Sequence, residues 1–140
     1  LEGEQLIGAS GCLHLILRTS WVYAARGGNF AKTMLRLAAE RDRLTVIDDQ
    51  FGAPTGADLL ADMTALALPR LRADAALGGT YHCAASGETS WHSYAQFVIE
   101  HAKRLQPHAP WKVLAIDPVP TQAFPTPARP RLPGLGRLAR

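Results

Sequence analysis

The 140-residue sequence lacks several features that define whole classes of proteins. Its two cysteines, Cys12 and Cys83, give neither a disulfide framework nor a paired thiol metal site, and we expect both to be buried as small apolar side chains. No apolar run approaches the roughly 20 residues that a membrane-spanning helix needs. No glycine-rich phosphate turn, HExxH sequence or internal repeat is present. No self-contained active site is therefore evident.

Acidic residues are missing from the end of the chain. The last 20 residues contain four arginines and no acid, whereas residues 1–120 carry 11 basic and 12 acidic residues. The net charge of +3 therefore comes from the tail, and the rest of the chain gives no basic patch that would indicate nucleic-acid binding.

Both ends of the chain differ from those of an ordinary domain. The sequence begins with Leu1 rather than methionine, and its first residues read as the middle of a helix without a capping residue. Eight of the ten prolines lie between Pro107 and Pro133, and residues 130–137 show neither strand nor helix periodicity. We expect a fragment of a longer protein with a disordered tail.

Strand and helix patterns alternate between these ends. Four segments predict strands: residues 13–18, 44–47, 79–84 and 112–116. Three helices are predicted: one after Asn29, one from Ala57 to about Leu68 that ends at Pro69, and one capped by Thr89 or Ser90. Such alternation is typical of an α/β fold with mostly parallel strand pairing.

Apolar residues at helical spacing mark one face of each predicted helix. These faces comprise Phe30, Met34, Leu35, Leu37 and Ala38 in the first helix, Leu59, Leu60, Met63, Leu66 and Ala67 in the second, and Tyr94, Phe97, Val98 and Ala102 in the third.

The loops that follow strands carry the residues of chemical interest, because open α/β sheets bind ligands there. Thr19, Ser20 and Trp21 leave the first strand, and taken alone a buried aromatic anchor explains this loop better than a ligand-stacking indole. Helix capping alone accounts for Asn29. The polar turn of residues 48–56 is explained equally well by function and by turn chemistry.

Histidines and the tail arginine give weaker signals. His82 lies in a predicted strand, and His92 and His101 share a predicted helix; surface or hydrogen-bonded histidines explain all three better than catalysis or metal binding. Arg129 follows a proline-stiffened segment that would suit a diphosphate, although a lone tail arginine is the simpler interpretation.

Five motifs taken together are more specific than any one of them. They are residues 17–23 (LRTSWVY), 29–35 (NFAKTML), 49–55 (DQFGAPT), 79–82 (GTYH) and 125–128 (PTPA). In order and spacing they resemble the dTDP-4-dehydrorhamnose reductases, which are extended short-chain dehydrogenase/reductases. The resemblance covers residues 1 to about 129.

The resemblance implies a fold and an activity. The expected fold is the remnant of a Rossmann-like parallel sheet with a small α/β substrate-binding domain over residues 1–129, followed by a divergent tail at 130–140. The family reduces dTDP-4-dehydro-L-rhamnose to dTDP-L-rhamnose with NADPH or NADH. Its Tyr-x-x-x-Lys pair and glycine-rich cofactor turn would precede Leu1, so no catalytic residue is assigned and the isolated chain is expected to be inactive.

The resemblance also implies roles for matching residues. Trp21 would line the sugar pocket. Thr19 and Ser20 would belong to the segment that runs beside the nicotinamide, and Asn29 would lie on the substrate side. Gln50 and Thr55 belong to the loop around the nucleotide-sugar, and Arg129 would contact the diphosphate. The family pattern breaks after Arg129, and a reading-frame shift there would produce the arginine- and proline-rich tail.

Cofactors and partners follow from the same resemblance. NADPH or NADH would be bound mainly by an N-terminal half outside this sequence. Some relatives dimerise around magnesium, and Asp58 is a candidate ligand, but no metal site is assigned. A dTDP-sugar, a homodimer of the intact enzyme and a cytoplasmic location are expected, without nucleic acid or membrane. The alternatives are a noncatalytic nucleotide-sugar-binding module and a decayed gene product.

Overall fold

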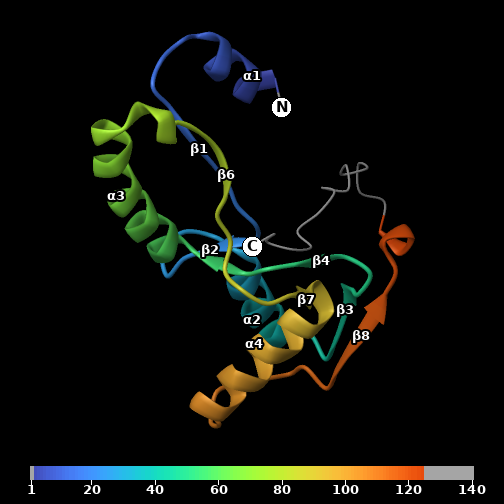
Figure 1. The fold of residues 1–140 in the computed structure, drawn as a ribbon. Helices are drawn as coiled ribbons and strands as arrows, with labels where there is room; N and C mark the ends of the chain where they lie inside the picture. The colour runs from blue at the N-terminus through green and yellow to red at the C-terminus, as the bar shows by residue number, and fades with distance from the viewer. Residues whose placement is uncertain (1, 125–140) are drawn as a thin grey trace. The chain divides into compact units, whose positions relative to one another are not determined.

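The computed structural model describes residues 2–124, and the chain divides into two compact units. Within the described residues, unit 1 comprises 2–29 and 53–87, and unit 2 comprises 30–52 and 88–124. The chain therefore passes from one unit to the other three times. Figure 1 labels the helices and strands along the chain.

Unit 1 contains two helices and two pairs of parallel strands. The strand β1 pairs with β6, with Leu15 opposite Gly79, and β2 pairs with β5, with Val22 opposite Thr55. The elements of unit 1 are α1 (Glu2–Ala9), β1 (Leu15–Arg18), β2 (Val22–Tyr23), β5 (Thr55–Gly56), α3 (Ala57–Ala73), a 3-10 turn (Ala75–Leu77) and β6 (Gly79–His82).

Unit 2 contains two helices and one longer pair of parallel strands. The strand β3 runs parallel to β8 over five residues, and β4 pairs with β7 in the antiparallel direction. The elements of unit 2 are α2 (Phe30–Glu40), β3 (Arg43–Ile47), β4 (Phe51–Gly52), β7 (Thr89–Ser90), α4 (Trp91–Leu105), β8 (Ala115–Val119) and a 3-10 turn (Thr121–Ala123).

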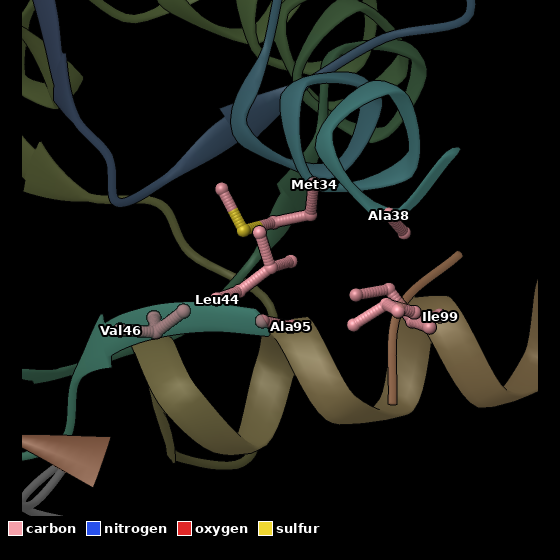
Figure 2. Packing of buried hydrophobic residues seen from close by; sticks show 7 residues of the cluster. Met34, Ala38, Leu44, Val46, Ala95 and Ile99 are labelled. Atoms are coloured by element: carbon pink, nitrogen blue, oxygen red, sulfur yellow. The ribbon is translucent and has the colours of Figure 1, made fainter. Parts of the chain in front are cut away.

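Buried apolar side chains gather in one cluster in unit 2. Figure 2 shows the cluster between α2, β3 and α4. Phe30 and Trp91 lie beside the cluster with ring centroids 4.4 Å apart. The seven clustered residues are Met34, Ala38, Leu44, Val46, Ala95, Ile99 and Val113.

Unit 1 buries much less apolar surface. Its buried apolar residues among those described are Ala53 and Leu71, each 6% exposed. The residues of β1 and β6 are half-buried or exposed. Unit 1 is therefore held together more by backbone pairing than by a side-chain core.

The α/β class and the mostly parallel pairing are confirmed. The strands predicted at residues 13–18, 44–47 and 79–84 are present as β1, β3 and β6. The helix after Asn29 and the Ser90 cap are confirmed, because α2 begins at Phe30 and the Ser90 side chain accepts a hydrogen bond from the Ser93 amide. No helix in the part of the chain that the structure describes could span a bilayer.

The prediction that Pro69 ends the second helix is wrong, because α3 continues through Pro69 to Ala73. A proline inside a helix removes one hydrogen bond to the carbonyl four residues earlier. Here the turn beyond it buries Leu71, and the Asp74 amide donates to the Arg70 carbonyl. This packing and capping favour the longer helix.

The predicted faces of the second and third helices are only partly correct. Leu59, Met63 and Leu66 of α3 are exposed, and Phe97 of α4 is 61% exposed. The buried residues of α4 are instead His92, Ala95 and Ile99. Apolar residues occur on more than one side of α4, so spacing alone did not identify the side that packs against α2.

Two smaller predictions are also corrected. The last strand starts three residues later than expected, at Ala115, because its register is set by pairing with β3. Cys12 is exposed and Cys83 is half-buried, so neither is a buried apolar residue. Cys12 lies just after α1, where its sulfur is 2.8 Å from the Ser10 hydroxyl.

Candidate functional site

The loop after β1 is the first part of the candidate site, and it lies in unit 1. Thr19 is exposed, whereas Ser20 and Trp21 are half-buried. The Ser20 hydroxyl accepts a hydrogen bond from the Ala53 amide at 3.3 Å. The Trp21 carbonyl accepts one from the Thr55 amide at 3.2 Å. The loop is thus attached to residues 53–55 on both sides of the Trp21 backbone.

Trp21 has an unusual backbone conformation. Among the described residues it is the one non-glycine residue with a positive φ, at +43°. A bulky residue in this region costs roughly 1–3 kcal/mol of strain and persists only where its surroundings impose it. Strained residues of this kind are concentrated at functional sites, which makes Trp21 a candidate binding residue.

Thr55 lies opposite this loop and is fully buried. Its hydroxyl donates to the Ala53 carbonyl at 3.0 Å and accepts from the Ala85 amide at 3.2 Å. The hydroxyl is therefore directed at backbone groups of unit 1. Its predicted place in the loop around a nucleotide-sugar stays a prediction.

Asn29 ends the first segment of unit 1 and directly precedes α2. It is half-buried, and its side-chain amide donates to the Ala24 carbonyl at 2.7 Å. This bond closes the loop of residues 24–29. A substrate-side role for Asn29 remains a prediction.

The first part of the polar turn after β3, residues 48–52, belongs to unit 2 and is held by hydrogen bonds to Thr121. The Asp49 carboxylate accepts from both the amide and the hydroxyl of Thr121, the latter at 2.6 Å. The half-buried Gln50 side chain donates to the Thr121 hydroxyl at 3.1 Å. Both contacts of Asp49 are therefore structural bonds to the 3-10 turn that begins at Thr121, and the predicted ligand role of Gln50 stays a prediction.

A second polar cluster in unit 2 was not visible in the sequence. The Ser90 hydroxyl donates to the Asp48 carboxylate, 42 residues away, and His92 Nδ1 lies 3.8 Å from the same carboxylate. Serine, histidine and aspartate are the residue types of a hydrolase triad, in which the imidazole takes the hydroxyl proton. Here the hydroxyl faces the carboxylate directly and His92 Nε2 faces the Ile116 carbonyl at 3.0 Å. The cluster therefore connects β3, α4 and β8 without the geometry for nucleophilic catalysis.

Charged residues next to the Trp21 loop form one ion pair in unit 1. The Arg18 guanidinium donates two hydrogen bonds to the Glu4 carboxylate, at 2.9 and 2.7 Å. These hydrogen bonds hold the pKa of Glu4 below its ordinary value and raise the pKa of Arg18. The pair connects α1 to the end of β1, directly before Thr19.

Within the described residues, the structure contains no metal cluster, and the apolar cavity of unit 2 is separate from the predicted site residues. The described residues contain no group of three or more His, Cys, Asp or Glu side chains that could hold a metal, and Asp58 is exposed at the start of α3. An apolar cavity of about 570 Å³ is bordered by Phe30, Trp91 and Phe124, and no predicted site residue among those that the structure describes lines it. Arg129 lies outside the described residues.

The structure thus brings together part of the predicted site. Ser20, Trp21 and Thr55 meet in unit 1, Asn29 belongs to the same unit, and Gln50 belongs to unit 2. Sequence reasoning missed the Ala53 and Ala85 amides, because backbone donors leave no pattern in the side-chain letters.

Comparison with known proteins gives a consistent result. The family model described as the RmlD substrate binding domain matches residues 1–135. The dTDP-4-dehydrorhamnose reductase of Shigella flexneri is 54% identical over 129 residues, which is 92% of this chain and 42% of that protein. The reductase of Salmonella typhimurium is 49% identical over 138 residues, covering 99% and 45%.

Solved structures agree with these relatives. A dTDP-4-dehydrorhamnose reductase from Clostridium acetobutylicum superposes with a TM-score of 0.75 at 34% identity, covering 91% of this chain and 41% of that one. The reductase of Bacillus anthracis, solved in complex with NADP, gives 0.68 at 35% identity, covering 87% and 39%. The chain therefore spans less than half the length of the relatives that it matches.

Proposed function

Because the chain belongs to the RmlD substrate-binding domain family, we propose that it binds the dTDP-sugar substrate of a dTDP-4-dehydrorhamnose reductase. The observation that carries this proposal is the family match over residues 1–135, supported by 54% identity to a reductase of that name. The reaction of the whole enzyme would transfer a hydride from NADPH to the C4 carbonyl of dTDP-4-dehydro-L-rhamnose and so give dTDP-L-rhamnose.

The Trp21 loop would supply the sugar contact. An indole presents a large apolar face that suits the apolar side of a deoxyhexose. Asn29 and Gln50 would contribute amide groups, Thr55 would belong to the same nucleotide-sugar loop, and Arg129 would pair with the diphosphate. Trp21 is the residue on which this assignment most depends, because its strained backbone already singles it out.

The cofactor would meet only an edge of this chain. NADPH supplies the hydride, and the NADP bound to the Bacillus anthracis relative supports this choice. Thr19 has an exposed hydroxyl that fits such a contact, whereas the Ser20 hydroxyl already accepts a bond from Ala53. The 140 residues contain no glycine-rich turn that would hold the pyrophosphate. The main cofactor contacts are therefore assigned to residues outside this sequence.

The isolated chain should bind without turning over. No Tyr-x-x-x-Lys sequence occurs in the 140 residues, so the acid that would protonate the carbonyl oxygen is absent from this sequence. With the keto sugar and NADPH, we expect no fall in NADPH absorbance above the rate without protein. A rate near that of a full-length relative would overturn this part of the proposal.

The cellular setting is proposed on similar grounds. Cys12 and Cys83 are free thiols, which is the usual state in a reducing cytoplasm. We therefore assign the protein to the cytoplasm, and the intact enzyme to a homodimer as the family resemblance implies.

Calorimetric titration of dTDP-L-rhamnose into the chain tests the proposal. We expect saturable one-site binding that Trp21→Leu weakens by about tenfold or more, equivalent to roughly 1.4 kcal/mol. Trp111→Leu is the matched control, since it removes an indole from unit 2 by the same substitution. Absence of binding to the wild-type chain, or equal losses in both variants, would contradict the proposal.

A further inference from the structure

Two hydrogen bonds lie on opposite sides of one rotatable bond in Trp21. The φ angle is the rotation about the bond from the Trp21 nitrogen to its Cα. The Ser20 hydroxyl comes before this bond and accepts from the Ala53 amide, and the Trp21 carbonyl comes after it and accepts from the Thr55 amide. Because both partners belong to the short segment 53–55, rotating φ alone away from +43° would break one of the two bonds.

The direction of the indole depends on the same rotation. The Cβ atom is attached to Cα, so a fixed φ fixes the Cα–Cβ bond relative to the incoming chain. Without an external constraint, a tryptophan would return to negative φ, where its side chain has no steric conflict with the backbone. The segment 53–55 therefore determines the direction in which the Cα–Cβ bond of Trp21 leaves the backbone.

Thr55 holds that segment in place. Its hydroxyl is fully buried and connects the Ala53 carbonyl to the Ala85 amide. The Thr55 side chain thus forms one bond within the segment 53–55 and one bond to Ala85, which follows β6.

We propose that Thr55 is a positioning residue that acts through Trp21. Its hydroxyl fixes the segment 53–55, this segment keeps Trp21 in the left-handed conformation, and the indole is thereby preset to receive the sugar of a dTDP-sugar. The part of this inference that concerns the ligand rests on the proposed function. The part that concerns the backbone of Trp21 can be tested without any ligand.

The first test measures the backbone of the ligand-free chain by NMR. In the wild type, a strong intraresidue NOE between the amide and Hα protons of Trp21 marks the positive φ. Thr55→Val keeps the shape but removes the hydroxyl, and we expect it to lose this signal and to speed hydrogen exchange at the Ala53, Thr55 and Ala85 amides. Thr55→Ser, which restores a hydroxyl, should recover both features.

One control variant and one alternative variant complete this test. Thr64→Val in α3 removes the hydroxyl that donates to the Leu60 carbonyl and should leave the Trp21 signal in place. If Thr55→Val does not fold, Ser20→Ala removes the other anchor and should also release the positive φ. Retention of the Trp21 signal in a folded Thr55→Val or Ser20→Ala protein would overturn the proposal.

The second test measures binding of dTDP-L-rhamnose by calorimetry. Thr55→Val should weaken binding by about tenfold, and Thr55→Ser should recover it to within about threefold of the wild type. Adding Thr55→Val to Trp21→Leu should cost little more than Trp21→Leu alone, because both act on one indole. Additive losses would overturn a role through Trp21. If the NMR result holds while the wild type binds no dTDP-L-rhamnose, the proposed function fails and the backbone role of Thr55 stands.

Discussion

Unit 2 buries seven apolar side chains in one cluster, while the described part of unit 1 buries two apolar residues and keeps a tryptophan in a strained conformation. The difference separates two tasks. Unit 2 closes a core from α2, β3, β8 and α4, which supplies stability from its own residues. Unit 1 relies on backbone pairing and places its polar contacts around the Trp21 loop. We infer that stability resides mainly in unit 2 and ligand recognition mainly in unit 1.

The largest expected effect is the loss of a core side chain from unit 2. Ile99 is 2% exposed, and Ile99→Ala should lower the free energy of unfolding by about 2–5 kcal/mol, through lost apolar burial and the cavity left behind. Urea unfolding of the chain measures it. Leu105→Ala on the same helix is the control, because Leu105 is 70% exposed and should change stability by at most about 0.5 kcal/mol. If Leu71→Ala in unit 1 cost more than Ile99→Ala, the comparison between the units would be reversed.

The next effect concerns the polar attachment of α4 in unit 2. The Ser90 hydroxyl accepts from the Ser93 amide and donates to Asp48, so Ser90→Ala removes a helix cap and a contact to β3. We expect a loss of about 1–2 kcal/mol, measured by thermal unfolding. Ser90→Thr keeps a hydroxyl and should recover most of the loss. Equal stability of Ser90→Ala and the wild type would show that this cluster does not support unit 2.

A smaller effect tests the strain in unit 1. At a positive φ glycine is favoured over alanine, so Trp21→Gly should be more stable than Trp21→Ala by about 1 kcal/mol. Tyr23 provides the matched pair in β2, where φ is not positive and Tyr23→Ala should be the more stable variant. Chemical denaturation of the four variants measures both differences. If Trp21→Ala were as stable as Trp21→Gly or more so, Trp21 would carry no backbone strain.

The smallest effect comes from the exposed ion pair of unit 1. Hydrogen bonds from Arg18 lower the pKa of folded Glu4, so the pair stabilises the protein above the unfolded pKa of about 4.3 and loses this effect as pH falls through the lowered folded value. Glu4→Gln should therefore melt below the wild type at neutral pH and approach it below about pH 4. Glu2→Gln, on the same helix, is the control. A difference that grows on acidification would have the wrong sign.

The sequence predicted the elements whose signals are local. Asn29 before an apolar repeat predicted the start of α2, and Ser90 predicted the start of α4. The end of α3 and the start of β8 were missed, because the packing of Leu71 and the pairing with β3 determine them. The strands β2, β4, β5 and β7 have two residues each, too few for any periodicity.

The loops of the candidate site could be predicted from the sequence, but the conformation and contacts of their residues could not. Residue types pointed to the Trp21 loop and to the turn after β3, but no letter pattern reports a positive φ. The contacts of Thr55 with Ala85 and of Asp48 with Ser90 join residues that are 30 and 42 positions apart. Such contacts depend on the folded chain, so the hydroxyl of Thr55 could be read as a ligand group until its burial was known.

Under the proposed function, Trp21 of unit 1 contacts the dTDP-sugar, whereas the buried cluster of unit 2 does not. The most direct measurement is an NMR titration of the isotope-labelled chain with dTDP-L-rhamnose. We expect the indole and amide signals of Trp21 and the amide signals of Thr19 and Ser20 to shift and saturate, while the amide signals of Ile99 and Val113 stay in place. Saturable shifts that leave Trp21 unchanged, or no shifts at all, would contradict the proposed function.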